Sequence, residues 1–160
     1  MSKKTIVVLS GAGLDAESGI KTFRAEDGTW ANVDINEVCT PTAWNTNPTR
    51  VNDFYNERRI EMLNSTPNKA HTDLAKAEEE FNIVHLTQNV SDLLERAGCS
   101  KVVHLHGEIL KARSSNPSID LHGDPTRLDL KAYRQYPVGK EGLNLNSTAA
   151  DGWSLRPDIV

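Results

Sequence analysis

The feature that most constrains this chain is an apolar run from Ile6 to Leu9, followed after Ser10 by the turn Gly11–Gly13. The pattern predicts a buried strand that leads through a tight turn toward a helix. It matches the first part of a dinucleotide-binding fingerprint, in which glycines let the backbone approach a phosphate near a helix N-terminus. Close packing of a helix against a strand is an alternative reason for the glycines, and this stretch alone leaves both open.

Strand-like and helix-like segments alternate along the chain, which favours an α/β fold. Beyond Arg113, Ser, Asn, Pro, Gly and Asp dominate up to Leu155, which indicates an irregular loop or small subdomain. Strands are predicted at 6–9, 83–86 and 102–105, a short helix at 16–20, and longer helices at 41–64, 70–81 and 90–97, the last closed by Gly98.

Composition excludes several function classes. The 160 residues carry a formal net charge of −4, which fits one soluble globular domain and gives no electrostatic basis for binding nucleic acid or anionic membranes. The N-terminus lacks the apolar core of a signal peptide, and no stretch has transmembrane length. Cys39 and Cys99 form no CxxC pair, which indicates free thiols in a reducing, cytoplasmic compartment.

An unrelated dinucleotide-dependent oxidoreductase is the least favoured interpretation. That fold places an acidic residue at the end of a second strand, about twenty residues after the glycines. Asp34 and Glu37 lie at about that distance, but their segment has no strand pattern.

Polar groups instead follow three predicted strands. They are Gly11–Gly13, Thr87–Asn89 and the pair His106-Gly107. Open α/β sheets bind ligands outside the carboxyl ends of their strands. These three segments therefore predict one joint site.

The chain resembles the N-terminal part of a sirtuin, an NAD-dependent protein-lysine deacylase. The matching stretches are GAGLDAESGIKTFR, DGTW, TQNVSDLLERAG, VVHLHGEILKAR and LRPDIV, in the family's order and spacing. The resemblance implies a Rossmann-like parallel sheet with flanking helices, incomplete in its C-terminal half. We expect a Rossmann-like NAD-binding part at 1–113, a small irregular subdomain at 114–153, and the start of a return strand at 154–160.

The resemblance implies that NAD binds at the glycine turn and the strand ends. His106 is implied to be the general base, a role that suits an imidazole because it titrates near neutral pH. The implied reaction joins the acyl-lysine oxygen to the anomeric carbon as nicotinamide leaves, and the acyl group is then transferred to ADP-ribose. The residues implied to bind NAD are Gly11, Ala12, Gly13, Phe23, Arg24, Gln88 and Asn89.

The closest resemblance is to the bacterial type with the sequence FYNERR, in which Tyr55 and Arg58 match a tyrosine-x-x-arginine pair. Three apart on a helix, the two side chains share a face and could hold a carboxylate on a succinyl or malonyl chain. The alternative is a solvated helix face shared with Glu57, Arg59 and Glu61. The resemblance favours recognition of acidic acyl groups.

Three substitutions depart from the family's site, and one of them is Leu94, which stands where a histidine is usual. Ser91 stands where the family has an aspartate that recognises the nicotinamide amide, and its hydroxyl could still bond that amide. Asp15 stands where a serine is usual, and its carboxylate would repel bound phosphates unless it is turned away or paired.

The family's four zinc cysteines are also missing. Ser114 stands at the first expected position and no cysteine follows Cys99, so we expect no zinc. The segment 115–153 must then be held by packing, expected around Leu121, Leu128, Leu130, Tyr133 and Tyr136.

The sequence ends at Val160, where the family continues with residues that pair with the peptide and bind adenosine. The expected partners are acyl-lysine proteins or peptides, with no nucleic acid and no membrane. A parallel sheet cut at this point would leave an exposed strand edge for self-association or for a complementing chain. The alternative function is that of an inactive sirtuin fragment that binds NAD, ADP-ribose or a protein.

Overall fold

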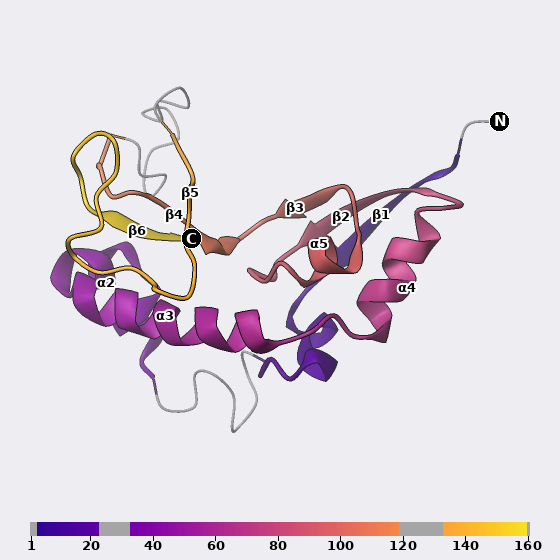
Figure 1. Cartoon of the computed structure of the whole chain (residues 1–160), viewed down its shortest axis with the longest axis horizontal. Coiled ribbons are helices and arrows are strands. Elements are labelled where there is room, and N and C mark those ends of the chain that lie inside the picture. Colours follow the sequence, from indigo (N-terminus) through magenta and orange to yellow (C-terminus); the bar gives the residue numbers. More distant parts are fainter. Residues whose placement is uncertain (1–2, 23–32, 119–132, 160) are drawn as a thin grey trace. The chain divides into compact units, whose positions relative to one another are not determined.

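The computed structural model describes residues 3–22, 33–118 and 133–159. Contacts divide the chain into two compact units (Figure 1). Unit 1 comprises Met1–Asn32 and Glu61–Glu108, and unit 2 comprises Val33–Ile60 and Ile109–Val160. The units do not follow chain order, because the segment 33–60 groups with the C-terminal residues. The sequence analysis divides the chain at residue 113 into consecutive segments, whereas the contacts group segments that are distant in sequence.

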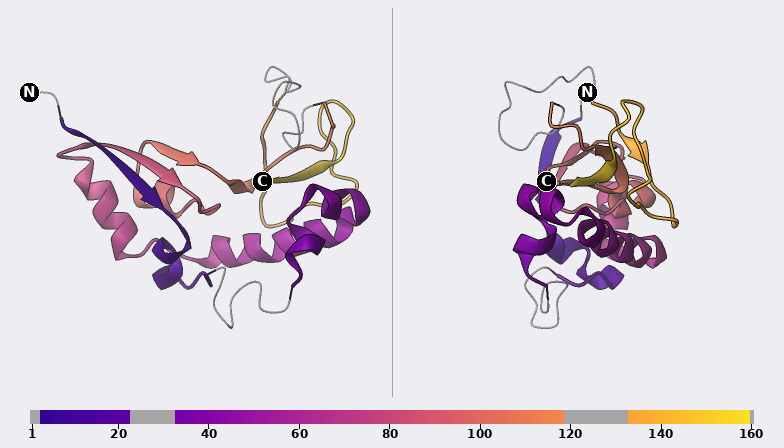
Figure 2. Two further views of the ribbon diagram at one scale, coloured as in Figure 1. Left: turned by 180° about the vertical axis from the view of Figure 1, so that it is seen from behind. Right: turned by 90° about the vertical axis from the view of Figure 1, so that its left-hand side faces the viewer.

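Unit 1 contains a parallel three-stranded sheet, which confirms the α/β fold class. Its strands are β1 (Thr5–Ser10), β2 (Asn82–Thr87) and β3 (Val102–His104), in the order β1-β2-β3. They run side by side in the left-hand view of Figure 2. The register aligns Ser10 with Thr87 and Thr87 with His104, so all three strands end at one edge. The strands lie where the apolar runs predict them.

Four short helices complete the described part of unit 1. The glycine turn leads into two 3-10 helices, η1 (Ala12–Leu14) and η2 (Ala16–Ser18). Helix α4 (Lys69–Ala77) precedes β2, and α5 (Leu93–Ala97) follows it. Helix α5 ends as predicted at Gly98, whose φ of 105° is left-handed, but it begins three residues later than predicted, at Leu93.

Unit 2 contains helices α1 (Ile35–Val38) and α2 (Pro41–Thr46) and most of α3 (Pro48–Asn64). The single helix predicted at 41–64 is divided at Asn47. The residue before a proline avoids the helical region, and Asn47 accordingly has an extended φ of −148°. The strands β4 (Gly107–Ser114), β5 (Tyr136–Pro137) and β6 (Leu155–Ile159) form a second sheet in the order β5-β4-β6.

The core of unit 2 is partly the one expected. Tyr136 packs against a buried apolar cluster, as predicted. Tyr133 instead has a polar role, because its hydroxyl donates to the carboxylate of Asp158, which also pairs with buried Arg113 at 3.1 Å. Leu121, Leu128 and Leu130 lie outside the described residues. The cluster consists of Ala112, Val138, Leu143, Ala149 and Leu155.

Arg59 corrects the interpretation of the helix around it as a solvated face. Its side chain is completely buried in unit 2. Its Nε donates to the carbonyl oxygen of Ile109 at 2.9 Å, and its Nη1 donates to Oδ1 of Asn56 at 2.6 Å. Burial lowers the pKa of the Arg59 guanidinium to about 10.

The sheet of unit 1 exposes large apolar side chains. Val7 and Leu9 of β1 are 60% and 67% exposed, and Val103 and Leu105 are 48% and 45% exposed. A parallel sheet is normally covered on both faces, so these side chains mark a surface that other residues would be expected to cover. In the part of the chain that the structure describes, no helix is long and apolar enough to cross a membrane.

Candidate active site

The three strand ends of unit 1 converge, as the sequence predicts. Asn89 follows β2, and its Nδ2 donates to the carbonyl oxygen of Gly11 after β1 at 3.0 Å. His106 follows β3, and its Nδ1 lies 3.1 Å from the carbonyl oxygen of Gln88. Hydrogen bonds therefore join residues from all three strand ends at the edge where open α/β sheets bind ligands.

The glycine turn is open rather than packed. A Cβ atom built on Gly13 would meet nothing within 4 Å, and one on Gly11 would meet only Oε1 of Gln88 at an ordinary 3.5 Å. Neither residue is among the described glycines with a positive φ. Neither close packing nor backbone conformation requires glycine here. Among the described residues, the turn therefore leaves room for a close approach to its backbone, as phosphate binding would need.

His106 is in a state that suits a base. A carbonyl oxygen can only accept a hydrogen bond, so the Nδ1 that contacts Gln88 must carry a proton. In the neutral ring, Nε2 then keeps its lone pair. The side chain is exposed, so this nitrogen can accept a proton from a bound molecule.

Asp15 and Ser91, two of the departures from the family pattern, form a pair. The Ser91 hydroxyl donates to Oδ2 of Asp15 at 2.7 Å, and both residues are buried. The other oxygen, Oδ1, accepts from Nε2 of buried His71 at 3.1 Å. The Asp15 carboxylate is thus paired, which is the condition under which it would not repel a bound phosphate.

Helix α4 positions His71 through its N-terminal cap. Asn68 accepts hydrogen bonds from the backbone N–H groups of Ala70 and His71, and the backbone N–H of Asn68 donates to Nδ1 of His71. The Asn68 amide also donates to the carbonyl oxygen of Leu14 at 2.7 Å. The cap therefore fixes both the imidazole and the turn that carries Asp15.

His104 supports the loop after β2. Its Nδ1 donates to the carbonyl oxygen of Asn89 at 2.8 Å, and its Nε2 donates to the Glu95 carboxylate at 2.8 Å. Burial lowers the pKa of His104, but these hydrogen bonds and the charge of Glu95 outweigh it and raise the pKa overall. With two acceptors, His104 is suited to holding the loop rather than to taking a proton.

Tyr55 and Arg58 lie on α3 in unit 2, in different surroundings. The Tyr55 hydroxyl is 3.0 Å from Sγ of Cys39, and burial raises the pKa values of both groups, that of Cys39 to about 11. Arg58 lies over the ring of Phe54 and pairs with Glu57 at 2.6 Å. Among the described residues, a pocket that includes Tyr55 but not Arg58 is lined by Val38, Cys39, Thr40, Val51, Tyr55, Arg156, Pro157 and Ile159.

The structure thus brings together most of the residues predicted to bind NAD, while Phe23 and Arg24 lie outside the described residues. Ala12 begins η1 in the glycine turn. The hydroxyl of Ser91 is already bonded to Asp15. Sequence reasoning missed His71 and His104, whose partners are distant in sequence; the only local signal was the helix-start spacing from Asn68 to His71.

Comparisons with known proteins agree with this geometry. A sequence model of the Sir2 family matches residues 11–160. An NAD-dependent protein deacylase from Helicobacter pylori is 48% identical over 157 residues, which cover 98% of this chain and 62% of that protein. Two solved structures, a Sir2 homologue with NAD (34% identity, TM-score 0.77) and a mutant Sir2 homologue with ADP-ribose (33%, 0.80), each cover 99% of this chain. The chain covers 57% and 59% of those two chains, so it spans about three fifths of these relatives.

Proposed function

This chain belongs to the Sir2 family, and we propose that it forms the nicotinamide-side part of the active site of an NAD-dependent protein-lysine deacylase. The observation that carries the proposal is the open glycine turn beside Gln88, Asn89 and His106. Nothing in the described residues explains glycine at positions 11 and 13, whereas a bound pyrophosphate would.

The described residues fit NAD. Backbone N–H groups of the turn Gly11–Gly13 would hold the pyrophosphate, as glycine turns do in dinucleotide-binding folds. Gln88 and Asn89 would contact the ribose; the Asn89 amide N–H already bonds Gly11, which leaves its carbonyl oxygen as an acceptor. When bound, NAD supplies the anomeric carbon that accepts the acyl oxygen as nicotinamide leaves. Phe23 and Arg24 would border that site.

His106 would act as the general base. The Gln88 carbonyl holds the proton on Nδ1, so Nε2 can take a proton from a ribose hydroxyl. The ring then carries a positive charge, which the same carbonyl oxygen stabilises through its bond to Nδ1–H. The Ser91 hydroxyl already donates its hydrogen bond to Asp15, so Ser91 could only accept a hydrogen bond from the nicotinamide amide.

The variant Gly13→Val tests the proposal. Because a Cβ there meets no atom within 4 Å, the variant should keep the thermal midpoint of the parent within about 2 °C, while NAD and ADP-ribose affinity falls at least about tenfold. Ala16→Val, which also ends in a β-branched valine at an exposed position, is the control and should retain binding. Equal affinity in the parent and Gly13→Val would contradict binding at this turn.

We propose further that the acyl groups removed include succinyl and malonyl, recognised by Tyr55 and Arg58. Tyr55 lines the pocket of unit 2, and Arg58 would have to exchange its contact with exposed Glu57 for the acyl carboxylate. Glu57 is the exposed member of the pair, so its carboxylate can return to water when Arg58 turns to the acyl carboxylate.

A cytoplasmic location is part of the proposal, because both cysteines are free thiols, as expected in a reducing compartment. Self-association through the apolar sheet surface is a further part, supported by the exposure of Val7 and Leu9. Binding of ADP-ribose with no release of nicotinamide in the presence of acyl peptide would favour the alternative of a binding module.

A further inference from the structure

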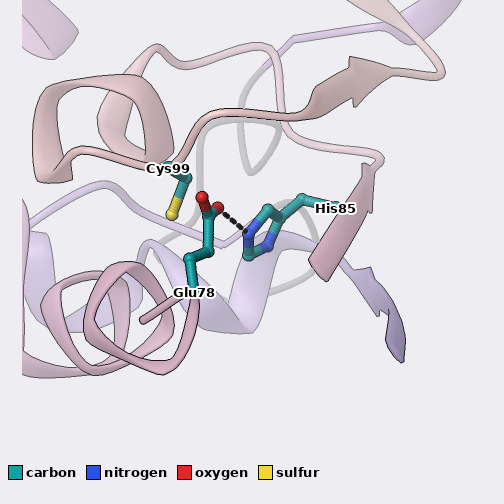
Figure 3. Close-up of side chains that lie close together, drawn as sticks. All are labelled: Glu78, His85 and Cys99. Carbon is teal, nitrogen blue, oxygen red and sulfur yellow. Dashed lines mark hydrogen bonds and ion pairs between the residues drawn. The ribbon is translucent and has the colours of Figure 1, made fainter. Parts of the chain in front are cut away.

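A second cluster of reactive side chains lies in unit 1, on residues that the proposed reaction does not use. Glu78, His85 and Cys99 point toward one another (Figure 3), and one ligand-type atom from each lies within 4.8 Å of the other two. They come from three places in the fold: Glu78 directly follows α4, His85 is in β2, and Cys99 follows Gly98 at the end of α5.

The cluster is enclosed but reachable. His85 is completely buried, Cys99 is 6% exposed, and the Glu78 side chain is 17% exposed. Glu78 is therefore the side from which an ion could enter.

The cluster combines an anchored carboxylate with a free thiol. Nε2 of His85 donates to Oε1 of Glu78 at 3.0 Å, and Glu78 also accepts from the backbone N–H and the hydroxyl of Ser100. These bonds hold the carboxylate in place. Cys99 is a free thiol, so its sulfur is available as a ligand beside Glu78 and Nε2 of His85.

We propose that Glu78, His85 and Cys99 form a binding site for a zinc ion. A thiolate, an imidazole and a carboxylate are the ligand types that zinc binds, and three protein ligands leave a fourth position for water or another group. On binding, Cys99 gives its thiol proton to solvent, and His85 gives up the proton on Nε2, takes one on Nδ1 and binds the ion through Nε2.

This site differs in kind from the four-cysteine module that the chain lacks. The expectation of no zinc rests on the absence of cysteines after Cys99 and on linear spacing. Linear spacing cannot reveal a site assembled from the ends of two helices and the middle of a strand. The ion would join α4, β2 and the loop after α5, so it would stabilise unit 1.

Zinc alone, added to the chelator-treated protein, tests the proposal. We expect one zinc per chain by competition with a chromophoric chelator and a higher thermal midpoint with zinc. Cys99→Ser and His85→Gln should each weaken binding at least about tenfold. Cys39→Ser, which removes the other thiol, is the matched control and should bind zinc like the parent.

Cobalt substitution identifies the ligands independently of affinity. The parent and Cys39→Ser should show sulfur-to-cobalt charge-transfer absorption, and Cys99→Ser should lack it. Glu78→Gln, which keeps the side-chain shape, serves as a second ligand variant if His85→Gln does not fold. The proposal is overturned if the folded parent binds no stoichiometric zinc, or if Cys99→Ser binds zinc as tightly as the parent.

Discussion

Exchanging Asp15 and Ser91 tests the buried pair beside the glycine turn. The two residues are 76 positions apart, and their side chains meet at 2.7 Å. We consider Asp15→Ser, Ser91→Asp and the double exchange, which restores one hydroxyl and one carboxylate in reversed positions. The double variant also has serine and aspartate where the resemblance to sirtuins implies them.

The magnitudes follow from the contacts. Asp15→Ser removes the acceptor of His71 and of Ser91, two hydrogen bonds to a charged group at about 1.5–3 kcal/mol each, so we expect a loss of about 3–5 kcal/mol. Ser91→Asp brings a second carboxylate against the buried one. Like charges this close cannot both ionise, so this variant should also be destabilised, by about 3 kcal/mol. The double variant regains the hydroxyl-to-carboxylate bond and avoids the repulsion.

Urea unfolding followed by circular dichroism gives the free energy of unfolding for the four proteins. We expect the double variant to be more stable than the sum of the single losses predicts, by at least about 2 kcal/mol. Asp53→Ser, at an exposed position of α3, is the control for loss of an acidic side chain and should change stability by no more than about 0.5 kcal/mol. Losses that add within about 0.5 kcal/mol would refute the coupling of Asp15 and Ser91.

Three further predictions concern chemistry, specificity and pH. His106→Ala should lower deacylation at least about 100-fold with a much smaller effect on NAD affinity; near-normal turnover when chemistry limits the rate would exclude it as the base. Arg58→Met should sharply lower kcat/KM for succinyl peptides and spare acetyl peptides, and Tyr55→Phe should do the same more mildly; equal losses on matched peptides would assign both residues to the fold. The raised pKa of His104 should contribute stability that is complete below about pH 6.5 and is lost as the pH rises through the folded-state pKa. Urea midpoints across this range should depend less on pH in His104→Gln, and an unchanged dependence would show that the bond to Glu95 is not its source.

The sequence predicted those helices and strands that are determined by residues close together in the chain. The three apolar runs of unit 1 are strands, and Gly98 ends α5 because it adopts a left-handed φ. The helix predicted at 41–64 is divided because Pro48 disfavours the helical conformation of the residue before it, Asn47. Strand β4 was not predicted, since its charged residues do not suggest burial. Arg113 in that strand is buried because it meets Asp158, 45 positions later, and no local pattern contains that partner.

The reason for a glycine at a given position could not be read from the sequence, as Gly142 and Gly13 show. Gly142 has a φ of +70°, and a Cβ there would come within 2.5 Å of the Asn56 side chain, which bonds the backbone of Leu143. That glycine is required by the fold of unit 2. Gly13 has neither property, since a Cβ there would meet none of the described atoms within 4 Å and its φ is not positive. A sequence records only that both positions lack a side chain. The distance from each missing Cβ to its neighbours separates a glycine kept for packing from one that leaves room for a ligand, and at Gly13 it favours the ligand.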